Sequence, residues 1–267
     1  MVKINQTAQP PGKIGRIWEL DTLRGITLIS MAVYHAMWDL VYLFGLRADW
    51  YNETPGYLWQ QSICWCFILL SGFCWGLGRR PLKRGLMVFG GGALVTAVTV
   101  LVMPAERVVF GVLTLIGSAM LLMIPLHTLF RKIPAQLAPI GALASALLFF
   151  LTRNVARGSF GFEGIRLGAV PEAFYQNYLT AYFGFPPDGF YSTDYFPLLP
   201  WFFLFLTGYF IFRAVSPFIR RKKESGGSSP APAAMKPFCW IGRHSLILYL
   251  LHQPVIYGVF QLIQMLL

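Results

Sequence analysis

Residues 22–44 form a long apolar segment and read TLRGITLISMAVYHAMWDLVYLF. It has the length of a membrane helix, because about 20 apolar residues cross the roughly 30 Å of hydrocarbon in a bilayer. It also contains ionisable residues, with Arg24 near its start and His35 and Asp39 further along. An ionisable side chain inside a membrane is costly and is usually retained for function. The stretch therefore predicts a transmembrane helix that carries a functional site.

Six further segments have the length and apolar character of transmembrane helices. They are residues 57–78, 84–103, 108–130, 134–152, 195–216 and 243–266. Charged residues make up only 12% of the chain, against about a quarter in a typical soluble domain, which argues against a water-soluble fold. We predict an all-α polytopic bundle of about seven transmembrane helices, forming a single membrane-embedded domain over residues 1–267.

The basic residues predict the orientation of this bundle, since cytoplasmic loops are enriched in Lys and Arg. The 22 Lys and Arg residues outnumber the 11 Asp and Glu residues, but they fall in short clusters between apolar segments, unlike a nucleic-acid-binding surface. The clusters are Arg79, Arg80, Lys83 and Arg84; Arg131 and Lys132; and Arg220, Arg221, Lys222 and Lys223. They follow the second, fourth and sixth segments, so the N-terminus is predicted to be cytoplasmic and the C-terminus to lie outside.

Three segments between or before the helices differ in composition. We expect residues 1–20 to form a polar cytoplasmic N-terminus and residues 220–237 to form a flexible cytoplasmic loop, because the latter includes the small, Pro-rich run ESGGSSPAPAA. Residues 153–194 lie outside and contain many Phe and Tyr residues, too many for a disordered spacer. This aromatic outer loop would form a lid or a ligand-binding surface, or anchor the chain at the membrane interface.

Polar side chains form one stripe along the first segment. At 100° per residue, Asp21, Arg24, His35 and Asp39 fall within about 60° of one another. His35 lies roughly 16 Å beyond Arg24 along the axis and Asp39 about 6 Å further, so the stripe connects both sides of the membrane. Because His35 and Asp39 are one turn apart, the carboxylate could orient the imidazole. The alternative is that both only bond to neighbouring helices, while Asp21 and Arg24 form an interfacial ion pair.

The other histidines are weaker candidates. On the last segment, Tyr249 and His252 share one face, where His252 would line the same cavity as His35 or be a core histidine held by a neighbouring helix. His127 and His244 adjoin basic residues at segment ends, where they are interfacial or contribute to an anion site for a cytosolic phosphate ligand. The four histidines lack a metal-ligand spacing, so we predict no metal.

Four stretches in order resemble the bacterial relatives of heparan-alpha-glucosaminide N-acetyltransferase. They are LDTLRGI (20–26) with the following His35 and Asp39, FGVLTLIG (110–117), DYFPLLPW (194–201), and WIGRHS (240–245) with Tyr249 and His252-Gln253-Pro254. The ten residues between Arg24 and His35 also resemble the signature of the broader membrane O-acyltransferase superfamily. The chain departs from the family pattern at Thr114, where a His is expected, and it is short for a bundle of ten or eleven helices.

The resemblance implies the function. It implies transfer of an acetyl group from cytosolic acetyl-CoA to an amine or hydroxyl of a sugar or glycan acceptor on the outer side, by a multi-pass protein of the plasma (inner) membrane. Acetyl-CoA would be the acyl donor, with no metal cofactor and no nucleic-acid partner. Direct transfer is favoured over an acetyl-histidine intermediate, and both remain open.

This reaction needs a base and stabilisation of the developing oxyanion. We assign His35 as the base and Asp39 as the carboxylate that orients it. Arg24 at the cytoplasmic end would bind the phosphates of CoA, since a guanidinium pairs well with phosphate oxygens. The remaining assignments are Arg243 and His252 to the acetyl-CoA site, and Asp194 and Tyr249 to the acceptor site.

Two other classes of membrane protein are alternatives. In a transporter the same stripe would serve as a proton relay, although the chain lacks the inverted repeats common in such proteins. A seven-helix receptor is opposed by the cytoplasmic N-terminus and by the absence of a Lys for retinal in the last segment. The run Gly90-Gly91-Gly92 indicates close helix packing and, with the large apolar surface, would permit a homodimer.

Overall fold

Long helices form at all seven predicted segments in the computed structural model, which describes residues 16–225 and 229–266. Their bounds are Trp18–Tyr42 (α1), Thr54–Trp75 (α3), Pro81–Val102 (α4), Val112–Phe130 (α5), Ala138–Thr152 (α6), Leu198–Glu224 (α8) and Ser245–Leu266 (α10). Most boundaries lie within a few residues of those predicted, and the main exception is α8, which continues about two turns further. The all-α prediction is confirmed.

Six of the described helices are long and apolar enough to cross a membrane. They are α3, α4, α5, α8, α10, and α6 with its flanking turns. α1 is 25 residues long but is not among the six, since its polar stripe lowers its apolar character. The chain is therefore a multi-pass membrane bundle, and the crossing by α1 that would make seven spans remains a prediction.

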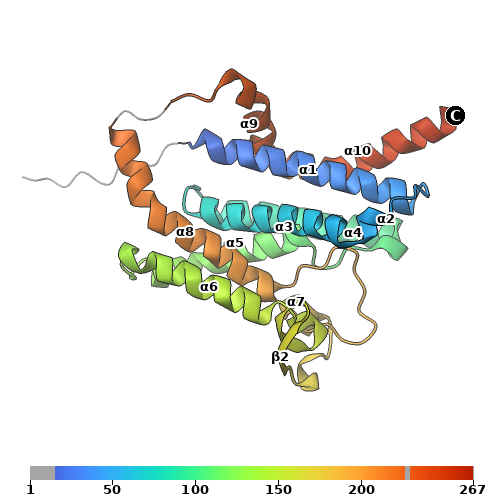
Figure 1. Ribbon diagram of the computed structural model, residues 1–267, viewed down its shortest axis with the longest axis horizontal. Helices are drawn as coiled ribbons and strands as arrows, with labels where there is room; N and C mark the ends of the chain where they lie inside the picture. Colours follow the sequence, from blue (N-terminus) through green and yellow to red (C-terminus); the bar gives the residue numbers. More distant parts are fainter. Residues whose placement is uncertain (1–15, 226–228, 267) are drawn as a thin grey trace, which may run out of the picture.

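The long helices run side by side, with α3 between α1 and α8 (Figure 1). α1 packs against α3, α9 (Lys236–Arg243) and α10, while α4 packs on α5 and α6 on α8. The basic segment ends gather at one end of the bundle, where Arg79, Arg213 and Arg220 line one cavity. The aromatic outer loop lies at the other end (Figure 1). The structure thus separates the two sets of loops as predicted, and we refer below to the inner and outer ends.

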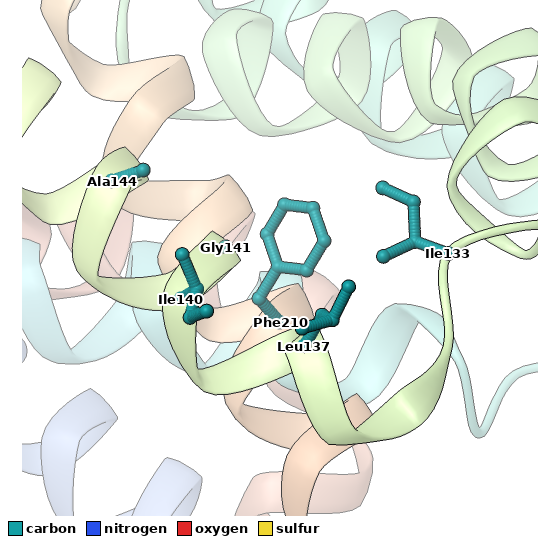
Figure 2. A pocket seen from close by; sticks show the side chains of 6 residues that line it. All are labelled: Ile133, Leu137, Ile140, Gly141, Ala144 and Phe210. Carbon is teal, nitrogen blue, oxygen red and sulfur yellow. The ribbon is translucent and has the colours of Figure 1, made fainter.

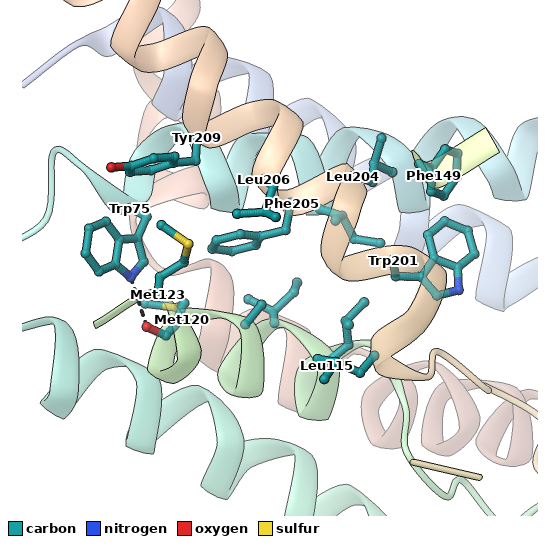
Figure 3. Close-up of a cluster of buried hydrophobic side chains, with 14 of the residues drawn as sticks. Trp75, Leu115, Met120, Met123, Phe149, Trp201, Leu204, Phe205, Leu206 and Tyr209 are labelled. Atoms are coloured by element: carbon teal, nitrogen blue, oxygen red, sulfur yellow. Dashed lines mark hydrogen bonds between the residues drawn. The ribbon is translucent and has the colours of Figure 1, made fainter. Parts of the chain in front are cut away.

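The main core lies between α3, α5, α6 and α8 and is filled by large side chains (Figure 3). Ile68, Met123 and Phe205 are fully buried there. Trp75 places its indole inside this core and donates a hydrogen bond of 3.0 Å from Nε1 to the carbonyl oxygen of Met120. Large side chains therefore fill the space between α3, α5 and α8.

Small residues let the helices approach closely, as membrane helices require. A Cβ atom on Gly72 of α3 would lie 1.9 Å from the carbonyl oxygen of Phe205 in α8. In the predicted Gly90-Gly91-Gly92 run, the close contact is at Gly92, where a Cβ atom would lie 2.5 Å from Oγ1 of Thr114. A Cβ atom on Gly90 would meet nothing within 4 Å. Thr114, which departs from the family pattern, is therefore a packing residue between α4 and α5.

Short elements connect the long helices. They are α2 (Asp49–Asn52), the 3₁₀ turns η1 (Pro104–Glu106), η2 (Ala135–Leu137), η3 (Val155–Arg157), η4 (Glu172–Phe174) and η5 (Ala233–Met235), the strands β1 (Ser159–Phe162) and β2 (Ile165–Ala169), and α7 (Tyr178–Phe183). β1 and β2 pair as an antiparallel hairpin, and Asn177 caps α7 through a capping box. The aromatic outer loop is thus folded, as its composition predicted, although the hairpin itself was not foreseen.

Glu163, at the tip of the hairpin, contacts α3. Tyr57 donates a hydrogen bond of 2.5 Å to Glu163, and Arg153 lies 3.5 Å from the same carboxylate. Burial tends to raise the pKa of Glu163, but the Tyr57 hydroxyl together with Arg153 and Arg157 brings it below its ordinary value. The carboxylate therefore stays ionised at neutral pH and holds the outer loop on the bundle.

Two predicted segments lie only partly within the described residues. Of the predicted polar N-terminus, residues 16–20 are described, and they lead into α1. Of the predicted flexible loop 220–237, residues 226–228 lie outside the described part of the chain. Its two ends are helical, in α8 and in η5 with α9.

Candidate functional site

The inner end of α1 carries an ion cluster centred on Asp21. This side chain is only 6% exposed and lies 2.6 Å from Nε of Arg16, 3.5 Å from Nη1 of Arg24 and 3.4 Å from Nε of Arg243. The predicted alternative for Arg24, an ion pair with Asp21, is present in the structure. Within the described residues, Arg24 and Arg243 give two guanidinium groups to this one carboxylate.

Close backbone contact between α1 and α9 builds this cluster. A Cβ atom on Gly25 would lie 2.1 Å from the carbonyl oxygen of Phe238, and one on Gly242 would lie 1.9 Å from that of Asp21. Thr22 and Cys239 meet beside them, with 3.1 Å between Oγ1 and Sγ. The stretches LDTLRGI and WIGRHS, more than 200 residues apart in the chain, therefore dock on each other.

Arg84 lies at the start of α4, at the inner end of the bundle. From sequence it served only to predict the orientation of the bundle. Its Nη1 atom is buried and has no hydrogen-bond partner within the described residues. The guanidinium fills the space beside Gly78, because a Cβ atom there would lie 1.3 Å from Nη1. Arg24 is close enough to interact with it electrostatically. A buried guanidinium next to another cation is unfavourable unless an anion joins them.

The outer half of α1 brings together two histidines from different helices. The rings of His35 and His252 have centroids 4.9 Å apart. Nδ1 of His252 contacts the carbonyl oxygen of Tyr249, which can only accept a hydrogen bond, so this nitrogen carries the proton in the neutral ring. Nε2 of His252 then has a free lone pair, and it is buried with no partner within the described residues. The structure thus places His252 beside His35, and its role in a shared site remains a prediction.

Asp39 is fully buried one turn beyond His35. Its Oδ1 atom accepts a hydrogen bond of 2.7 Å from Nε2 of Gln253 on α10. The contacts that the structure gives Asp39 do not include a bond to His35, the partner predicted from sequence. Oδ2 of Asp39 and Oε1 of Gln253 have no hydrogen-bond partner within the described residues. Together with His252 they leave three acceptor atoms without donors at the outer end.

Asp194 lies at the start of α5 rather than beside the two histidines. Its Oδ2 atom accepts a hydrogen bond of 3.1 Å from the backbone N–H of Val112, in the first turn of α5. Burial raises the pKa of Asp194 to about 6, while that hydrogen bond lowers it. The backbone N–H of Phe196 bonds the carbonyl of Phe110 at 2.9 Å. The stretches FGVLTLIG and DYFPLLPW therefore also pair with each other.

Tyr249 links the two regions, since it packs beside His252 with ring centroids 5.3 Å apart. Asp194 is near enough to interact electrostatically with it.

His127 and His244 lie away from His35 and His252. Nδ1 of His127 is 2.8 Å from the Tyr209 hydroxyl, at the inner end of α5, whereas His244 is exposed beside α9.

Apolar side chains on α1 separate the inner and outer clusters. Leu28 and Met31 are buried with Ile63 in a small cluster of their own. Leu248 and Tyr249 of α10 pack against this cluster. Buried apolar side chains thus form a strip along α1 between the arginines and the histidines. This strip lies apart from the main core of Figure 3.

The family model described as heparan-alpha-glucosaminide N-acetyltransferase, catalytic, matches residues 16–254. The chain belongs to this family. The comparison with curated proteins and the comparison with solved structures gave no match. As a member of the heparan-alpha-glucosaminide N-acetyltransferase family, the chain is a transmembrane acetyltransferase. The matched residues include both the arginine cluster and the two histidines.

A cavity of about 270 Å³ between the start of α6 and α8 differs from this site (Figure 2). Its lining is apolar, with Leu137, Ile140 and Phe210 among the side chains. It presents no group that could transfer a proton or bind an anion. This cavity therefore lacks the side chains that acetyl transfer requires.

Proposed function

We propose that this acetyltransferase moves an acetyl group from cytosolic acetyl-CoA to an amine or hydroxyl of a sugar or glycan acceptor on the outer side. The observation that carries the proposal is the arrangement along α1. The guanidinium groups of Arg24, Arg84 and Arg243 lie at its inner end, and a histidine pair with a free lone pair lies roughly 16 Å away along the axis. A donor with phosphates at one end and a thioester at the other fits such an elongated site.

His35 remains our proposed base, and His252 takes the supporting role first assigned to Asp39. A hydrogen bond from His35 to Nε2 of His252 would fix the tautomer of His35, and the short distance between the rings supports this. The acceptor nitrogen or oxygen then attacks the thioester carbonyl carbon and gives its proton to His35. The C–S bond breaks, and CoA leaves as the thiolate and later takes up a proton.

The donor phosphates would be bound at the inner end. Arg24 and Arg243 already share Asp21, so they retain positive charge for an added anion. Arg84 adds a buried guanidinium with an unused N–H donor. Guanidinium groups bind phosphate oxygens with strong charge-assisted hydrogen bonds.

The acceptor would be bound at the outer end. Asp39 and Gln253 each present an oxygen without a partner, and these atoms require a donor such as the N–H or O–H groups of a sugar. Tyr249 lies on the same side of α10, and Asp194 is within electrostatic range of it. In this proposal Asp39 binds the acceptor and does not orient His35.

Calorimetric titration of acetyl-CoA into purified protein tests the donor site. We expect Arg84→Gln to weaken binding by about tenfold or more, because a charged hydrogen bond is lost. Gly78→Ala should weaken binding as well without changing the charge, since its methyl group displaces the Arg84 guanidinium. Lys83→Gln removes an exposed charge at the same end and should bind like the wild type. Folded wild-type protein that does not bind acetyl-CoA would overturn the proposed function.

A further inference from the structure

A second polar cavity, of about 460 Å³, lies at the inner ends of α3, α5 and α8. Its lining includes Arg79, Arg213, Arg220 and His127, together with the apolar side chains of Leu77 and Phe212. No Asp or Glu is among the lining residues. The cavity is thus strongly basic on one part of its wall and apolar on another.

Large buried side chains close the inner part of this cavity, while Gly78, beside which the Arg84 guanidinium lies, forms another part of its lining. Tyr209 forms part of the wall and is only 1% exposed, and Trp75, which is 6% exposed, packs against His127 with ring centroids 5.0 Å apart. Behind them lies the main core shown in Figure 3. The lining that the structure gives this cavity includes neither His35 nor His252.

The arginines of the cavity have different surroundings. Arg213 is held in place by hydrogen bonds from its guanidinium to the carbonyl oxygens of Phe130 and Ile133, at and just after the end of α5. Arg79 and Arg220 are exposed and form no ion pair within the described residues. The Arg213 guanidinium is therefore fixed, whereas those of Arg79 and Arg220 can change their rotamers. No carboxylate among the lining residues neutralises them.

We propose that this cavity binds the phosphate headgroup of an anionic phospholipid from the leaflet at the inner end. Basic pockets between transmembrane helices on the cytoplasmic side are suited to anionic lipid headgroups. The arginines would bind the phosphate oxygens, while Leu77 and Phe212 would contact the apolar part next to the headgroup. A free phosphate ion would leave this apolar wall unused, which favours a lipid. The proposal does not depend on the acetyl-transfer reaction.

Native mass spectrometry and thermal melting of detergent-solubilised protein test this proposal. The test variant is Arg79→Gln with Arg220→Gln. The control variant is Lys83→Gln with Arg221→Gln, which removes the same charge from exposed residues outside the cavity lining. We expect phosphatidylglycerol, but not phosphatidylcholine, to bind and stabilise the wild type and the control. Its affinity for the test variant should fall by at least about tenfold.

Equal binding of phosphatidylglycerol by the test variant and the control would overturn the proposal, as would equal stabilisation by phosphatidylcholine. If inorganic phosphate stabilises the wild type to the same extent as phosphatidylglycerol, the ligand of this cavity is a free anion and the lipid proposal is wrong. Acetyl-CoA affinity should be the same in the test variant and the control. A loss of acetyl-CoA binding in the test variant alone, with lipid binding kept, would make the cavity a donor site and overturn the assignment to a lipid headgroup.

Discussion

Replacing His35 by Ala is expected to lower the rate of acetyl transfer by about 10² to 10⁴, the contribution typical of a positioned general base. His252→Ala should produce a loss of similar order, because the two rings act together. The double variant should be little slower than either single variant, since residues that act as a unit give non-additive effects. Release of CoA thiol from acetyl-CoA in the presence of an amino sugar such as glucosamine measures the rate.

Two comparisons separate a catalytic loss from an unfolded protein. His244→Ala removes an exposed histidine at the inner end and should leave the rate near that of the wild type. Titration of acetyl-CoA should give unchanged affinity in His35→Ala and His252→Ala, because the phosphates are bound at the other end of α1. If His252→Ala retained full activity while His35→Ala was inactive, the pairing of the two rings would be wrong.

The second large effect is structural and concerns the contact between α1 and α9. Gly25→Leu is expected to destabilise the protein by at least about 3 kcal/mol, the upper part of the usual range for overpacking. A Cβ atom at this position would lie 2.1 Å from the carbonyl oxygen of Phe238, and a backbone atom cannot rotate away as a side chain can. The helices would have to separate, which would also pull Arg243 away from Asp21.

Gly90→Leu is the matched control for this prediction. It introduces the same side chain into another long helix, at a position where a Cβ atom meets nothing within 4 Å. Leu is also a better helix former than Gly. The melting temperature of Gly90→Leu should therefore equal or exceed that of the wild type. Melting temperature and the fraction of monodisperse protein after solubilisation measure both variants. Equal melting temperatures would show that the α1–α9 contact is looser than described.

The sequence predicted the long helices well because their signal is local. An apolar run of about 20 residues needs a helix in the membrane whatever surrounds it. The short α9 and the β1–β2 hairpin were not predicted. α9 follows a Pro-rich run, and its amphipathic face has meaning only against α1. The hairpin depends on the contact of Glu163 with Tyr57, which lies 106 residues away in the chain, as well as on the nearer Arg153.

The candidate site was predicted in part. The stripe on α1 followed from helical geometry, and the close approach of His252 to His35 was one of two interpretations of that residue. The bond between Asp39 and Gln253 could not be predicted, because it joins residues 214 positions apart. Arg84 was hidden among basic residues that were used only to set the topology. Its importance comes from its buried, unpaired Nη1 atom, which no sequence pattern reveals.

The resemblance found four separate stretches, and the structure shows how they pair. LDTLRGI docks on WIGRHS at the inner end through Gly25 and Gly242. FGVLTLIG is bonded to DYFPLLPW at the outer end through Asp194 and Val112. Sequence could rank these stretches as important but could not show which of them touch, because their contacts span from about 80 to more than 200 residues of the chain.

The central claim is acetyl transfer from one side of the membrane to the other. The most direct test uses proteoliposomes that enclose glucosamine, with acetyl-labelled acetyl-CoA added outside and the orientation of the N-terminus determined by protease access. The account predicts that labelled N-acetylglucosamine accumulates inside vesicles whose protein has its N-terminus outward, while acetyl-CoA stays outside, and that His35→Ala abolishes this accumulation. Product that forms only when acetyl-CoA and glucosamine are on the same side of the membrane would contradict it.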